Sequence, residues 1–224
     1  MKCVVTAGPS YEELDQVRRL TNFSTGALGS ELADYLVGQG HEVELLRGHY
    51  STCRAETKAQ RLQIFTTGAD LSRRLEELRG PGVRAVFHAA AVGDFAFGKI
   101  WRRGQGGELT EVTSPKISTR GEPLLAELLP TPKIIGRLRT WFPAARLVGW
   151  KFEVEGSRDR VVAEAERQRQ QNQTDACVAN GPGYGAGFGL VTGAGQCLDL
   201  TEKSDLFAAL GSLLKLDRSD PPQA

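Results

Sequence analysis

The strongest constraint on the fold is a repeated alternation of short apolar runs with longer segments that show helical periodicity. The runs at 2–6 and 84–92 contain few charged residues, as expected for strands that are buried on both faces of a parallel sheet. Between them, segment 24–39 carries apolar side chains along one helix face, at Leu28, Leu32, Tyr35 and Leu36. This alternation predicts an α/β fold, namely a Rossmann-like, doubly wound and mostly parallel sheet with helices on both faces.

The same pattern continues toward the C-terminus. We expect further strands at 41–46, 62–66, 124–129, 146–153 and 176–180, a late hairpin, and helices at 70–79, 132–141, 157–173 and 203–216. The proline-containing tail at 219–222 is expected to fray. No repeat or clear linker divides the 224 residues, so we predict a single domain that spans 1–224.

Residues 95–123 interrupt this alternation. They are rich in Gly, Arg and Lys, have weak periodicity, and contain a glycine-rich stretch at 104–107 that we expect to be mobile. A loop of this length is uncommon in a compact domain unless it is functional or disordered. We therefore interpret 95–123 as an irregular insertion. A shorter polar loop is expected at 11–21, soon after the first strand.

Charge and composition exclude several classes of protein. The chain has 28 Lys plus Arg and 27 Asp plus Glu, a net charge of +1, whereas a nucleic-acid or membrane-surface binder needs a basic excess. No run approaches 18 apolar residues, and the N-terminus begins a strand, not a signal peptide. The four single cysteines favour reduced thiols, and the three histidines lack metal-ligand spacing. We expect a cytoplasmic protein with no nucleic-acid partner, no membrane partner and no protein-ligated metal.

The sequence Asn-Phe-Ser-Thr-Gly-Ala-Leu-Gly at 22–29 is the strongest candidate for a ligand site. It opens the predicted helix, whose first turn would present free N–H groups and a partial positive charge. Gly26 would let a phosphate approach the backbone closely. An ordinary N-cap at Ser24 explains these residues equally well. The position after the first strand, where open sheets bind nucleotides, is compatible with the phosphate site.

Two other segments could contribute to such a site. Ala89, Ala90 and Ala91 end the central strand, and their small side chains would clear space at the carboxyl edge of the sheet, with Asp94 at its rim. Tight packing of a helix against the alanines is the alternative. Lys116 lies in the insertion, where it is either an ordinary solvated lysine or a residue that folds over a nucleotide and stabilises charge on phosphate.

The motifs of dinucleotide-dependent reductases are missing where they should stand. The glycine fingerprint is absent after the first strand, and so are a Walker sequence and a Tyr-x-x-x-Lys pair. Residues 181–186 match GxGxxA, but a strand-like run follows them where the fingerprint requires a helix. We interpret 181–186 as a flexible loop near the ligand.

In this order, these segments resemble the phosphopantothenate–cysteine ligase family, both its stand-alone form and the C-terminal half of the bacterial bifunctional flavoprotein. The resemblance covers nearly the whole chain. Its most specific part is Val17-Arg18 followed by Asn-Phe-Ser-Thr-Gly at 22–26, which is similar to V-R-x-[IL]-x-N-x-S-[ST]-G. The other matching segments are TAG at 6–8, AAAVGDF at 89–95, PKI at 115–117, VGWKFE at 148–153 and VAN at 178–180.

The resemblance implies a nucleotide-binding ligase of coenzyme A biosynthesis that joins an acid to an amino acid. CTP or ATP would activate the carboxylate of 4′-phosphopantothenate as an acyl-nucleotide, and the amine of L-cysteine would then displace the nucleotide, giving 4′-phosphopantothenoylcysteine. Mg²⁺ would arrive with the triphosphate, and no organic cofactor would be needed. The family is dimeric, so residues 95–123 would be a flap and dimerisation segment of a homodimer.

The resemblance also gives roles to particular residues. Asn22 would handle the carboxylate and the acyl intermediate, Lys116 would stabilise charge on the transferring group, and Arg18 would join them in the catalytic set. The nucleotide-binding residues would be Gly8, Ser24, Gly26, Gly29, Ala89, Ala90, Ala91, Asp94, Trp150 and Asn180.

The chain departs from the CTP-dependent bacterial members at several places. Residues 116–119 read Lys-Ile-Ser-Thr instead of K-x-K-K, Gln168 and Asn172 replace two helix lysines, and 131–133 read Thr-Pro-Lys instead of Asn-Pro-Asp. Phe23 and the flap pattern are closer to the ATP-using eukaryotic type, so we expect ATP to be accepted at least comparably to CTP. A NAD(P)-dependent reductase on the same fold and a non-catalytic nucleotide-binding relative remain the alternatives.

Overall fold

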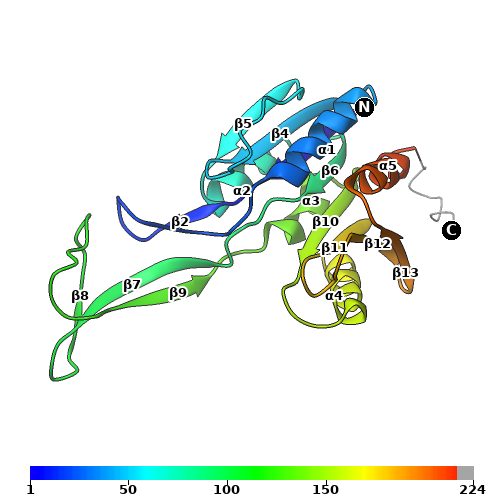
Figure 1. Cartoon of the computed structure of the whole chain (residues 1–224). Helices are drawn as coiled ribbons and strands as arrows, with labels where there is room; N and C mark the ends of the chain where they lie inside the picture. The colour runs from blue at the N-terminus through cyan, green and yellow to red at the C-terminus, as the bar shows by residue number, and fades with distance from the viewer. Residues whose placement is uncertain (216–224) are drawn as a thin grey trace.

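The computed structural model describes residues 1–215 and is built on an eight-stranded sheet (Figure 1). In spatial order the strands are β13 (Gln196–Leu200), β12 (Phe188–Gly193), β11 (Ala176–Asn180), β10 (Arg146–Phe152), β6 (Val83–His88), β1 (Lys2–Ala7), β4 (Glu42–Gly48) and β5 (Arg61–Phe65). The strands from β11 to β5 are parallel, and β12 and β13 pair antiparallel. The predicted doubly wound, mostly parallel fold is therefore confirmed. The tail at 219–222, for which fraying was expected, lies outside the described residues.

Helices cover both faces of this sheet. One face packs against α1 (Ala27–Gly38) and α5 (Lys203–Leu213). The other packs against α2 (Gly68–Glu77), the 3₁₀ turn η1 (Ile134–Arg137) with α3 (Leu138–Trp141), and α4 (Arg158–Gln171). Val4 and Val5 of β1 belong to opposite hydrophobic clusters, because side chains alternate along a strand. Within residues 1–215, no helix is long and apolar enough to cross a membrane.

The insertion at 95–123 is more regular than its composition predicts. β7 (Phe95–Arg103), β8 (Leu109–Glu111) and β9 (Leu124–Pro130) form a separate antiparallel sheet in the order β8-β7-β9. Figure 1 shows this sheet extending away from the main sheet, and we call it the arm. Both faces of the arm are accessible, so its strands lack the alternation of apolar and polar residues that a half-buried strand needs.

The polar loop expected at 11–21 is a hairpin of β2 (Tyr11–Glu13) and β3 (Arg19–Thr21). Its turn is held by Asp15, whose Oδ1 accepts the N–H groups of Val17 (2.9 Å) and Arg18 (2.7 Å). These are the local contacts that Asp makes in turns. Strands of three residues are too short to produce a periodic sequence signal.

Several predicted elements differ in their bounds from what their sequences suggest. The helix expected from residue 24 begins at Ala27, because Gly26 has a left-handed φ of 74°. The strand expected over 84–92 ends at His88, and beyond it Ala91 forms only an isolated parallel bridge with Pro9. The helix expected at 132–141 is divided into η1 and α3.

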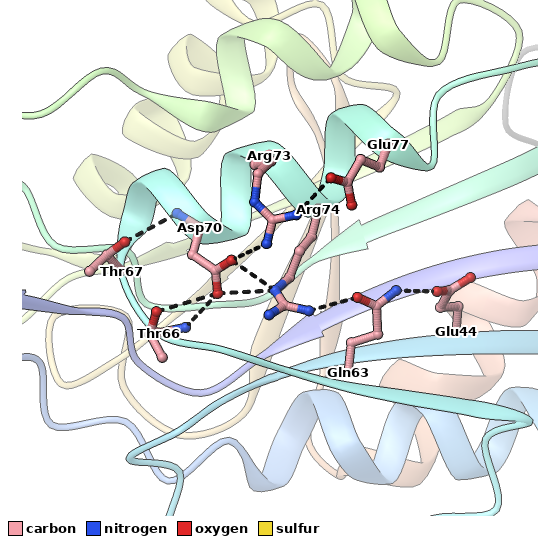
Figure 2. A network of polar contacts seen from close by, with 8 residues as sticks. All are labelled: Glu44, Gln63, Thr66, Thr67, Asp70, Arg73, Arg74 and Glu77. Atoms are coloured by element: carbon pink, nitrogen blue, oxygen red, sulfur yellow. Dashed lines mark hydrogen bonds and ion pairs between the residues drawn. The ribbon is translucent and has the colours of Figure 1, made fainter.

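A polar network attaches α2 to the edge of the main sheet (Figure 2). Asp70 accepts the Thr66 N–H (3.0 Å) and the Nε of Arg74 (3.0 Å). Arg74 also donates to Gln63 (2.9 Å), whose amide donates to the buried carboxylate of Glu44 (2.6 Å). These bonds lower the pKa of Asp70 against the opposing effect of its partial burial. The network fixes α2 next to the ligand edge of the sheet.

Candidate functional site

A cavity of about 680 Å³ opens at the carboxyl edge of the main sheet. It lies where the strand order reverses, since β4 continues on one side of β1 and β6 lies on the other. Open α/β sheets bind ligands at such a switch point. The predicted site residues that line the cavity are Asn22, Ser24, Gly26, Gly29, Ala89, Ala90, Ala91, Asp94, Trp150 and Asn180.

The N-terminus of α1 forms one wall and is open to a ligand. Its N-cap is Gly26, which makes no side-chain cap bond, so the interpretation of Ser24 as an ordinary N-cap is wrong. Thr25 Oγ1 accepts the N–H of Ala27 (3.2 Å) at the start of the helix. The first intrahelical bond runs from the Ser30 N–H to the Gly26 carbonyl (3.1 Å). The amides of Leu28 and Gly29 therefore have no intrahelical acceptor and can bind an anion.

Close backbone packing explains the glycines of this wall. A Cβ on Gly26 would lie 2.3 Å from Ser51 Oγ and 3.1 Å from Gly8 Cα, and a Cβ on Gly29 would lie 2.7 Å from Ala7 Cβ. Gly8 itself has a φ of 80° and does not line the cavity. Gly8 therefore supports the wall from behind and is not placed to touch a ligand directly.

Asn22 lies between the start of α1 and the end of β6. Its Nδ2 donates long hydrogen bonds to the carbonyls of Ala91 (3.4 Å) and Val92 (3.3 Å), and its side chain is exposed at the cavity. The adjacent Phe23 also lines the cavity and is fully exposed. Asn22 is thus placed to exchange weak internal bonds for bonds to a ligand.

Sequence reasoning missed His88, the last residue of β6. It lines the cavity yet is buried, and one ring nitrogen lies 2.9 Å from Thr6 Oγ1. The same hydroxyl accepts the Ala90 N–H (3.1 Å). Burial lowers the pKa of His88 to about 4, so its imidazole is neutral at pH 7.

The charged side chains of the cavity are paired. Lys133 forms an ion pair with Asp94 across the rim, and Lys151 lies 2.7 Å from Glu153. Thr131 fixes the loop before Lys133, because its hydroxyl donates to the Gly93 carbonyl (2.6 Å). Lys133 was not among the predicted site residues, and its place at the rim adds a cation to the site.

Two polar atoms in the cavity wall have no hydrogen-bond partner within residues 1–215. They are Trp150 Nε1, a donor, and Asn180 Oδ1, an acceptor, and both are buried. Their residues lie on the neighbouring strands β10 and β11, with Trp150 opposite Val178. Buried polar groups are normally paired, so unpaired ones are typical of functional sites.

Arg18 and Lys116 do not line the cavity. Arg18 donates to the Ile117 carbonyl and lies 3.1 Å from Asp15, while the Ile117 N–H donates to Asp15 (3.1 Å). These contacts attach the insertion to the β2–β3 hairpin and leave Lys116 exposed. Lys116 can reach a ligand only if its segment moves or if a second copy supplies it.

The glycine loop at 181–186 does not line the cavity either. A Cβ on Gly181 would lie 2.4 Å from the Glu153 carbonyl oxygen, and the Gly183 N–H donates to that carbonyl (3.0 Å). The glycines of this loop serve close packing against the segment after β10, and its place near a ligand stays a prediction. No cluster of three or more potential metal ligands occurs within residues 1–215.

Fold and cavity together define a Rossmann-like protein with a candidate ligand site at the N-terminus of α1. The family model "DNA/pantothenate metabolism flavoprotein C-terminal domain" matches residues 1–210, and the chain belongs to this family.

Two similar curated proteins are larger than this chain. The coenzyme A biosynthesis bifunctional protein CoaBC of Thermococcus kodakarensis is 32% identical over 179 residues, which cover 80% of this chain and 41% of that protein. CoaBC of Haemophilus influenzae is 26% identical over 166 residues, which cover 73% of this chain and 37% of that protein. The chain thus spans 41% or less of the length of these two relatives.

Solved structures share the fold over nearly the whole chain. The DNA/pantothenate metabolism flavoprotein of Streptococcus pneumoniae superposes with a TM-score of 0.81 at 25% identity, covering 96% of this chain and 98% of that one. A Cab2 mutant in complex with phosphopantothenate-cysteine superposes with a TM-score of 0.70 at 18% identity, covering 96% of this chain and 86% of that one. At that identity the second likeness concerns the fold alone.

Proposed function

We propose that the chain is a phosphopantothenate–cysteine ligase. It would activate 4′-phosphopantothenate with CTP or ATP and couple the product to L-cysteine. The observation that carries the proposal is the meeting of Asn22, the uncapped N-terminus of α1 and the alanine segment at one cavity. Family membership and the printed name of the CoaBC relatives support it.

The proposed chemistry has two steps. A carboxylate oxygen of phosphopantothenate attacks the α-phosphorus of the nucleotide, and pyrophosphate leaves. The amine of cysteine then attacks the acyl carbon, the acyl–phosphate C–O bond breaks, and the nucleoside monophosphate leaves while the amine loses a proton. Neither step needs a protein nucleophile, so positioning and charge stabilisation are the enzyme's main contributions.

The cavity residues suit these tasks. The free amides of α1 would hold phosphate oxygens, and the Asn22 amide would donate to an oxygen of the carboxylate or acyl intermediate. Lys133 could leave Asp94 for the more highly charged triphosphate, and Lys116 would add a further cation once its segment reaches the site. Mg²⁺ would enter as the nucleotide complex, and Asp94 is the only carboxylate among the described residues that line the cavity.

A homodimer in the cytoplasm completes the proposal. The arm exposes several large apolar side chains, namely Phe95, Leu109, Leu125, Leu128 and Leu129. A monomer rarely leaves such a group in water, so a second copy is the partner we propose for this surface. All four cysteines are free, which suits a reducing compartment.

The alternatives are separable by experiment. Purified chain with phosphopantothenate, MgATP or MgCTP should release pyrophosphate, and release should stop when phosphopantothenate is omitted. A non-catalytic relative would bind nucleotide without releasing pyrophosphate. A reductase would be stabilised by NADPH and not by either triphosphate in a thermal-shift comparison.

A further inference from the structure

Gln168 on α4 is held in one orientation by its contacts. Its Nε2 donates to the Trp150 carbonyl (3.0 Å) and approaches Cys177 Sγ (3.4 Å). A carbonyl oxygen can only accept, so the nitrogen, and not Oε1, must face Trp150. The usual ambiguity between the two ends of a glutamine amide is therefore resolved.

The orientation leaves an acceptor available to a ligand. Gln168 lines the cavity, and its Oε1 receives no hydrogen bond from residues 1–215. Among the described residues, Gln168 Oε1 is not one of the polar atoms that are both buried and unpartnered. Since it has no partner, it is accessible, and a ligand can reach it. Gln168 therefore presents the cavity with a fixed acceptor and no free donor.

The surroundings of this amide suit a flat ring. Gly149 makes room for it, because a Cβ there would lie 3.0 Å from Gln168 Nε2 and 2.7 Å from Ile135 Cδ1. Ile135 and Gln168 thus lie close together over Gly149 of β10, and both line the cavity. An apolar side chain beside a fixed acceptor matches a nucleobase that carries an exocyclic amine.

We propose that Gln168 is a specificity-determining residue that accepts a hydrogen bond from the exocyclic amine of the nucleobase. It would favour adenine and cytosine, which carry that amine, over hypoxanthine and uracil, which carry a carbonyl at the same place. The inference rests on the proposed ligase function, since it concerns the base of that reaction's triphosphate.

The test compares pairs of nucleotides that differ only in whether the base carries an exocyclic amine or a carbonyl. For the wild-type chain, kcat/KM should be about tenfold higher for ATP than for ITP. It should likewise be about tenfold higher for CTP than for UTP. This is the effect expected when one neutral hydrogen bond is lost because Gln168 Oε1 meets a carbonyl instead of an amine. Gln168→Met keeps the side-chain length but removes the acceptor, so both ratios should fall to near one.

A purely structural role gives a different result. If Gln168 only supports Trp150, Gln168→Met will lower kcat/KM for all four nucleotides equally and leave both ratios unchanged, which would overturn the proposal. Gln171→Met, at an exposed position of the same helix, is the matched control and should change neither ratio.

Failure of the ligase function would remain distinguishable from failure of this inference. If no nucleotide is turned over, calorimetric titration of the chain with MgATP and MgITP measures the same discrimination in binding. Preference for MgATP that disappears in Gln168→Met would support the role of Gln168. Equal affinity of the wild-type chain for both nucleotides would refute it.

Discussion

Asn22 is the residue on which the proposed second step depends most. Its amide now donates to two main-chain carbonyls over long distances, and it could donate to a carboxylate-derived oxygen instead. In Asn22→Asp the carboxylate cannot donate, so activation should proceed while cysteine addition is impaired. Pyrophosphate should still form, and acyl-nucleotide should accumulate in quenched samples. Normal formation of the cysteine adduct by this variant would rule out the role.

Lys116 provides a second test at a single residue. Losing one cation that stabilises the transferring group should lower kcat by roughly 10²–10³ while nucleotide affinity changes little. Lys116→Gln is the variant, with Lys58→Gln as a control at another exposed lysine. Steady-state rates and direct nucleotide titration separate the two effects. An unchanged kcat would mean that Lys116 is an ordinary solvated residue.

At the scale of elements, the start of α1 depends on Gly26. A side chain there must adopt a φ of 74° and would meet Ser51 Oγ. The left-handed conformation alone costs about 1–2 kcal/mol, which corresponds to a fall in Tm of roughly 2–8 °C. Gly26→Ala should show this fall in calorimetry and should weaken nucleotide binding. Gly38→Ala, where no atom lies within 4 Å of the new Cβ, should do neither.

The arm is the element proposed to join two copies. Leu128 of β9 is 48% exposed, so Leu128→Glu would place a charge in the proposed interface. Sedimentation equilibrium should find a dimer for the wild-type chain and a shift toward monomer for the variant. Leu62→Glu, at a similarly exposed leucine on the edge strand β5, should leave the dimer intact. A wild-type monomer at micromolar concentrations would contradict the proposed dimer.

Elements differed in how well the sequence predicted them. The strands and helices around β1 and α1 are long, periodic and buried, so pattern alone placed them. The β2–β3 hairpin and the arm strands β7 and β8 were missed because these strands are short or exposed on both faces, and neither condition produces a periodic signal. The third strand of the arm, β9, was expected at 124–129. The early end of β6 was missed because the alanines that follow His88 are also apolar and extend the apolar run beyond the strand.

The site was partly predictable because the buried strands of the main sheet were predictable. Residues that follow the ends of β1, β6, β10 and β11 meet at one edge of a parallel sheet, so Asn22, Asp94 and Asn180 could be grouped from the sequence. Lys133 and Gln168 come from segments whose place depends on packing of η1 and α4. His88 was assigned no role, because a buried neutral histidine has no distinctive sequence pattern.

At the scale of the whole molecule, the nucleotide preference follows from the combined cavity. The described residues that line the cavity include Gln168 and Lys133, at positions where the resemblance implies a lysine and an aspartate in CTP-dependent members. We expect kcat/KM for ATP to be at least comparable to that for CTP at saturating phosphopantothenate. Strict CTP dependence would contradict this and would point to recognition of the base by main-chain groups.

The most direct test of the central claim is a rapid-quench experiment analysed by mass spectrometry. The chain is mixed with 4′-phosphopantothenate and MgATP or MgCTP, first without and then with L-cysteine. We predict that phosphopantothenoyl-nucleotide appears with pyrophosphate in the first stage, and that it is converted to 4′-phosphopantothenoylcysteine and nucleoside monophosphate in the second. Nucleotide binding without any acyl-nucleotide or cysteine adduct, for either triphosphate, would contradict the assignment of this chain as a ligase.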